Sequence, residues 1–104
     1  ILIIGSGNLV HNIRQAAFPD LDAKPYDWAV EFDSKVEECL NKGDHESLIN
    51  YRNWGRVSQL AHPTPDHYYP LMYTIALQRP NDSLTYPYTG FHYASASMRA
   101  VKIG

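Results

Sequence analysis

Two histidines with chemical potential stand in residues 62–71, which read His-Pro-Thr-Pro-Asp-His-Tyr-Tyr-Pro-Leu. Pro63 and Pro65 restrict the backbone, so the imidazoles of His62 and His67 are held in a defined relation without much packing around them. A neutral imidazole on a rigid segment is a good metal ligand or proton-transfer group. The spacing differs from the i, i+4 pair of a zinc protease helix. A proline-rich turn with surface histidines is the alternative interpretation.

A third histidine, His11, comes after the glycine-containing segment Gly5-Ser6-Gly7-Asn8. A dinucleotide-binding loop would need a third glycine where the chain has Val10, so that function is disfavoured. We expect the glycines to let the backbone bend sharply at the end of a strand, where ligand sites of open α/β sheets gather. Asn8 is then expected to cap a helix that begins after it. His11 becomes a candidate base or metal ligand, with a histidine packed in the core as the alternative.

The apolar pattern predicts the elements that position these histidines. Residues 1–4, Ile-Leu-Ile-Ile, form a branched apolar run that ends at a glycine, which predicts a central strand covered on both faces. Residues 25–42 predict a helix packed on the sheet, and Gly43 suits the position after its end. Together they predict an α/β fold, a central, mostly buried sheet flanked by helices. The helix should bury Trp28, Ala29, Phe32, Val36, Cys39 and Leu40 and expose Asp33, Lys35, Glu37, Glu38 and Lys42.

Shorter elements are predicted in the rest of the chain. Asp44 is expected to cap a short helix through residue 51 that turns Leu48 and Ile49 inward, with His45 exposed in its first turn. Residues 53–61 are expected to be a loop or irregular helix. Pro70 opposes a helix that starts at Pro65, so a kink or a later start is expected before the helix ends near residue 78. Residues 84–88, 91–94 and 97–103 are expected to be extended, and His92 is a weaker candidate than His11 or His67.

The composition limits the class of protein. The 104 residues fit one small domain, and 44% hydrophobic residues are ordinary for a globular fold. A net charge of −2 offers no basic surface for nucleic acid, and no apolar run is long enough to span a membrane. The single Cys39 excludes an internal disulfide and favours a reducing compartment, so we expect a cytoplasmic protein. Because the chain opens on its most apolar strand, we expect it to belong to a larger protein.

Two motifs in this order, Ile-Ile-Gly-Ser-Gly-Asn-Leu-Val-His-Asn at residues 3–12 and the proline-rich stretch at residues 62–71, resemble the LigB-type (class III) extradiol ring-cleavage dioxygenases. The 4,5-DOPA dioxygenase group is the most similar, and Ser-Ala-Ser-Met at residues 95–98 with Val-Lys-Ile-Gly at residues 101–104 agrees with its C-terminus. The resemblance covers the whole chain. It implies that residues 1–104 are the C-terminal part of an extradiol dioxygenase catalytic domain whose N-terminal part is missing.

The resemblance also implies a cofactor and roles. The family uses non-haem Fe(II) and O₂ to open a catechol, here a DOPA-like one, and Zn²⁺ binds the same imidazoles readily. His67 matches a metal ligand, and His11 matches the acid/base at the edge of the metal, with a direct bond from His11 to the metal as a further possibility. His62 and Asn8 are implied in the wall of the substrate pocket or just outside the metal ligands. Two further histidine ligands lie upstream, so the isolated chain is expected to be inactive.

The roles implied by the resemblance carry a geometric expectation. A base that acts on a metal-bound catechol must reach it within about one hydrogen bond or one water molecule. We therefore expect the side chains of His11 and His67 to converge on one pocket, although more than fifty residues separate them in the sequence. His62 should stand nearby but turned away.

Two other functions fit the same residues. The chain is either a non-catalytic fragment or subunit that packs on a partner, or a simple zinc-binding domain that uses His11, His62 and His67. Upstream sequence with two further histidines would favour the dioxygenase, whereas metal retention by the 104 residues alone would favour the zinc domain. Each of these three functions is compatible with an oligomer.

Overall fold

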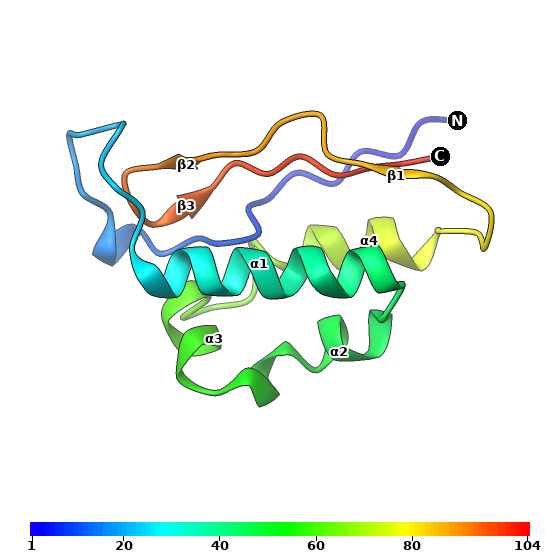
Figure 1. Ribbon diagram of the computed structural model, residues 1–104, viewed down its shortest axis with the longest axis horizontal. Helices are drawn as coiled ribbons and strands as arrows, with labels where there is room; N and C mark the ends of the chain where they lie inside the picture. Colours follow the sequence, from blue (N-terminus) through cyan, green and yellow to red (C-terminus); the bar gives the residue numbers. More distant parts are fainter.

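The computed structural model describes all residues, 1–104, and shows helices and strands in separate layers (Figure 1). Helix α1 (Asp27–Lys42) lies between the strands and a second helical layer, α2 (His45–Ile49) and α3 (Arg56–Ala61), and it contacts strand β3 as well as both helices. Helix α4 (Tyr69–Ala76) packs beside α2. The predicted α/β class is confirmed, with the helices in this chain gathered on one side of the strands. No helix combines the length and the apolar character that crossing a lipid bilayer requires.

The strands form two small antiparallel sheets. Strand β1 (Leu84–Thr85) pairs with β4 (Lys102–Ile103), and β2 (Phe91–His92) pairs with β3 (Ala96–Ser97). Each lies in or at the edge of a segment predicted to be extended. Two of these predictions hold only in part: Tyr93 and Ala94 form a turn with positive φ, and residues 97–103 do not form one strand. His11 joins the second sheet through an isolated antiparallel bridge to Ala96. The sheet therefore reaches His11, although no continuous strand contains it.

The prediction of a central buried strand at residues 1–4 is wrong for this chain. These residues belong to no sheet, and the side chains of Leu2 and Ile4 are 82% and 78% exposed. In Figure 1 the segment runs beside the C-terminal end of the chain without pairing with it. An apolar run becomes a buried strand only where neighbours accept its backbone hydrogen bonds and cover its faces, and these 104 residues supply neither.

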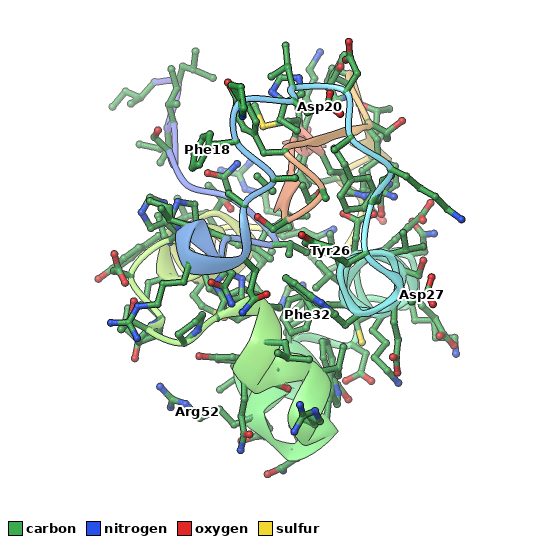
Figure 2. The ribbon with its side chains drawn as sticks, turned by 90° about the vertical axis from the view of Figure 1, so that its left-hand side faces the viewer. Phe18, Asp20, Tyr26, Asp27, Phe32 and Arg52 are labelled. Atoms are coloured by element: carbon green, nitrogen blue, oxygen red, sulfur yellow. The ribbon has the colours of Figure 1, made fainter.

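Helix α1 confirms most of its prediction. It begins at Asp27 rather than residue 25 and ends at Lys42. Gly43 follows with a left-handed backbone (φ 68°), and its N–H donates to Leu40 O at 3.1 Å. Four of the predicted apolar residues are buried, whereas Trp28 and Cys39 are half-buried. Phe32 points from α1 toward α3 (Figure 2). Asp33 departs from the prediction: it is 5% exposed, because the guanidinium of Arg99 binds its carboxylate from the other layer.

The short helices depend on local caps. The Asp44 carboxylate accepts from the Ser47 N–H at 3.1 Å and starts α2, as predicted. Leu48 is fully buried, but Ile49 is 64% exposed, so the prediction that Ile49 points inward is wrong. Adjacent residues of a helix point in different directions, and this five-residue helix turns only Leu48 toward the core. Residues 51–61 form the 3₁₀-helix η2 (Tyr51–Trp54) and α3. Helix α4 has the later start that Pro70 predicts, with that proline in its first turn, and it ends at Ala76.

One aromatic cluster in the core fixes the proline-rich stretch. Tyr68 is fully buried, and its hydroxyl donates to Leu48 O at 2.7 Å. Its ring lies 4.3 Å from that of Tyr51 and 5.9 Å from that of Phe32, measured between centroids. Because Tyr68 is the next residue after His67, this packing determines where the His67 backbone lies.

Candidate active site

The side chains of His11 and His67 lie face to face. Their ring centroids are 3.5 Å apart and the ring planes differ by 11°. The His11 backbone is held on both sides, by its N–H donating to Ala61 O at 3.0 Å and by its bridge to Ala96. The predicted convergence of these two side chains is confirmed. The residues next to each histidine in the sequence do not bring the two side chains together. The packing of the core does so.

The surroundings of the pair favour a neutral His11. Partial burial lowers the pKa of His11, the neighbouring His67 lowers it further, and the carboxylate of Asp66 opposes both effects. The His67 side chain is 41% exposed, and its Nε2 lies 3.7 Å from Asp66 Oδ2. A neutral imidazole keeps a lone pair that can accept a proton or bind a metal ion.

The two glycines of the first motif allow the chain to pass against the start of α4. The Asn8 N–H donates to His67 O at 3.0 Å. A Cβ on Gly7 would collide with the carbonyl oxygen of His67, and one on Gly5 would lie 2.7 Å from that of Pro70. Neither glycine has a positive φ. The motif thus serves close backbone approach, which positions His67, rather than the sharp bend that we expected to require it.

Asn8 does not cap a helix, so that expectation is wrong. Its side-chain amide donates to Ser97 O at 3.0 Å and lies 3.6 Å from Met98 Sδ. Asn12 is the cap instead: its Oδ1 accepts from the Gln15 N–H at 3.3 Å at the start of the 3₁₀-helix η1 (Ile13–Gln15). No helix follows Asn8: the chain bends at residues 9–10 and then bridges to the second sheet at His11. Asn8 nevertheless lines the grooves on both sides of the histidine pair.

His62 lies in the core, turned away from the pair as expected. It is 5% exposed, its Nε2–H donates to Leu9 O at 2.8 Å, and its Nδ1 is buried without a partner. Burial lowers the pKa of His62 to about 4. Its hydrogen bond supports the segment that leads to His11. A zinc site built from His11, His62 and His67 is not formed, and no group of three or more His, Cys, Asp or Glu side chains is placed to hold a metal ion.

The two other histidines differ in position. His45 of α2 is half-buried rather than exposed as expected, because its Nε2–H donates to Gln78 Oε1 at 2.8 Å, away from the pair. His92 of β2 lies with His11 in one groove of about 270 Å³, which we call the histidine groove. Sequence reasoning ranked His92 too low because only the strand pairing puts it beside His11. A larger groove of about 620 Å³ lies on the His67 side, between residues 1–9, α4 and the C-terminal strand.

The residues present match part of a non-haem iron site. Such sites commonly use two histidines and one carboxylate and leave positions open for substrate and O₂. His11 and His67 are adjacent, partly accessible imidazoles, so they suit this donor set. They provide two nitrogen ligands at most. On their own, these two imidazoles would fill only part of such a donor set.

Three known proteins that this chain is similar to carry the same name. No family model matches the chain. "4,5-DOPA dioxygenase extradiol" of Escherichia coli K12 is 36% identical over 107 aligned positions, which cover 100% of this chain and 39% of that protein. The chain is homologous to part of this protein. The proteins of the same name from Beta vulgaris and Mirabilis jalapa are 38% and 35% identical over 71 positions, 68% of this chain and 26% of each relative.

A solved structure supports the fold. The crystal structure of the uncharacterized protein JW3007 from Escherichia coli K12 matches with a TM-score of 0.85 and 35% sequence identity. The match covers 95% of this chain and 41% of the solved one. The chain thus spans well under half of the length of each of these relatives.

Proposed function

We propose that this chain is the C-terminal catalytic part of a LigB-type extradiol dioxygenase, which opens a catechol ring with O₂ at a non-haem Fe(II) ion. The observation that carries the proposal is the stacked His11–His67 pair, formed by two motifs that are distant in the sequence. The names of the relatives support the same reaction. The DOPA-like side chain of the substrate comes from those names and from no residue of this site.

In this proposal His67 is an iron ligand, and the remaining ligands come from the part of the longer protein that this chain does not cover. When bound, iron would supply the Lewis-acid and redox chemistry that ring opening with O₂ requires. His11 acts as acid/base: its ring nitrogen takes a proton from a substrate hydroxyl and returns it later. The lowered pKa of His11 supports this role, because it keeps the imidazole neutral and able to accept a proton near pH 7.

The test uses the longer protein that contains this chain, loaded with Fe(II) and mixed with a catechol in air. We expect one O₂ to be consumed per catechol, and the product to weigh one O₂ more than the substrate, since extradiol opening incorporates both oxygen atoms. A His45→Ala variant is the control, because His45 lies away from the pair. An iron-loaded protein that consumes no O₂ with any catechol would refute the proposal.

A second candidate is a non-catalytic unit that packs on other protein. The exposed apolar residues 1–4 favour it, because a run of this kind is normally covered. Such packing is also required of a catalytic part, so the oxygen assay separates the two. Absence of turnover in the iron-loaded longer protein would leave the packing function as the better explanation.

A further inference from the structure

Three residues form one row across the second sheet. Ala96 of β3 pairs with His92 of β2 on one side and with His11 on the other. Side chains of directly paired residues project from the same face of a sheet. His11 and His92 therefore stand on one face with a methyl group between them, and all three line the histidine groove.

The row leaves space for a planar ring. Paired residues on adjacent strands have Cα atoms roughly 5 Å apart, which separates His11 from His92 by roughly 10 Å. A planar ring with contacts on both faces needs roughly 7 to 8 Å between the neighbours that enclose it. Ala96, the middle residue of the row, has only a methyl side chain, so the space between the two histidines above it is not filled by these three residues.

The rest of the groove is suited to an aromatic ligand. Phe18 is 60% exposed and packs on Tyr93, with 4.5 Å between the ring centroids. Figure 2 shows Phe18 at this end of the molecule, on the segment between η1 and α1. Phe18, Tyr93 and Met98 all line the groove and give it apolar walls. Exposed aromatic side chains around a concave site are typical of small-molecule binding.

The turn that carries His92 is strained and firmly held. Tyr93 and Ala94 both have positive φ, 53° and 64°, which costs non-glycine residues conformational energy. Three backbone hydrogen bonds offset this cost: Ala17 N–H to Tyr93 O at 2.8 Å, Tyr93 N–H to Leu21 O at 3.0 Å, and Tyr26 N–H to Ala94 O at 3.1 Å. Strain of this kind concentrates at functional sites, and here it determines the position of His92.

We propose that the substrate's aromatic ring lies over Ala96, between His11 and His92, and that His92 is a specificity-determining residue that contacts the ring. The inference rests on the proposed function and adds the position of the substrate ring and the residues that contact it, in a groove of about 270 Å³. Ala96 forms the floor of the ring site. His11 acts at the hydroxyl groups, and His92 closes the opposite side.

The test compares steady-state kinetics of two variants of the longer, iron-loaded protein with unsubstituted catechol. Ala96→Leu fills the floor and should raise KM at least about tenfold, while Ala76→Leu at the exposed end of α4 is its control. His92→Ala removes one aromatic contact and should raise KM roughly fivefold with kcat nearly unchanged. His45→Ala should change neither value, because His45 does not line the histidine groove. Circular dichroism checks that each variant is folded.

The outcomes separate this inference from the proposed function. Turnover with an unchanged KM in His92→Ala and Ala96→Leu would overturn the ring site and leave the dioxygenase proposal standing. If the unmodified protein opens no catechol, the dioxygenase proposal fails, and NMR titration of the same protein with catechol decides the ring site. Shifts of the His92 ring and Ala96 methyl signals would support it, and their absence would overturn it.

Discussion

Arg99 reaches from the segment after β3 to the carboxylate of Asp33 on α1, with Nη2 at 2.7 Å and Nε at 3.2 Å from Oδ2. Both side chains are nearly buried, 9% and 7% exposed. The hydroxyl of Ser97 donates to the same carboxylate at 2.6 Å, and the carbonyl of Ser97 accepts from Asn8. This pair connects the helical layer to the strand residues that border the histidine groove.

Replacing Asp33 by alanine should lower the free energy of unfolding by about 3 to 5 kcal/mol, because it leaves the buried guanidinium of Arg99 without its main partner. Urea denaturation followed by circular dichroism measures the loss. Glu38→Ala is the matched control on the same helix: its partner Lys42 is exposed, and we expect little change. Equal losses in the two variants would contradict the role assigned to Asp33.

Acidification should destabilise the fold through His62. The folded chain keeps this imidazole neutral to about pH 4, whereas the unfolded chain binds a proton below about pH 6.5. The unfolded state therefore holds more protons between these values, so the free energy of unfolding falls as the pH drops from 6.5 to 4, by about 3 kcal/mol for this group. Above pH 6.5 the contribution is constant.

Urea denaturation at pH 7.5, 5.5 and 4.5 tests this behaviour in the unmodified chain and in His62→Gln, which cannot titrate. The stability difference between the two should shrink as the pH falls. A difference that stays constant across this range would show that His62 titrates normally in the folded chain.

Loss of each histidine of the pair should have a different effect in the longer protein. His67→Ala should lose iron, because we propose His67 as a metal ligand. His11→Ala should keep iron and lose roughly 10² to 10⁴ in turnover, the usual contribution of an acid/base group. Metal analysis beside the oxygen assay measures both, with His45→Ala as reference. The same iron content in both variants would refute this division of roles.

Gly7→Ala should displace the His67 backbone, since the added methyl group meets the carbonyl oxygen of His67. Overpacking of this kind costs about 1 to 3 kcal/mol of unfolding free energy. Ser6→Ala, one position earlier and exposed, should leave stability unchanged. Urea denaturation of both variants is the measurement, and a fully stable Gly7→Ala chain would show that the close approach is not required.

The sequence by itself determined the elements that depend on neighbours a few residues away. The helix at residues 27–42 results from apolar residues at helical spacing, and its end results from Gly43, which takes the left-handed backbone without strain. Asp44 caps α2 through the N–H three residues on. The two histidine motifs were also found in the sequence, and their resemblance to one enzyme family predicted that His11 and His67 converge.

Only the tertiary structure decided the features that depend on distant partners. Asp33 has the spacing of a surface residue but is buried beneath Arg99. His62 is neutral because burial in the core lowers its pKa. His92 faces the same groove as His11 through the pairing of both with Ala96. A local pattern specifies which face of a helix or strand is apolar, but it does not specify which distant residue packs against that face. For the same reason, the apolar run at residues 1–4 indicated a strand but could not supply the neighbours that would bury it.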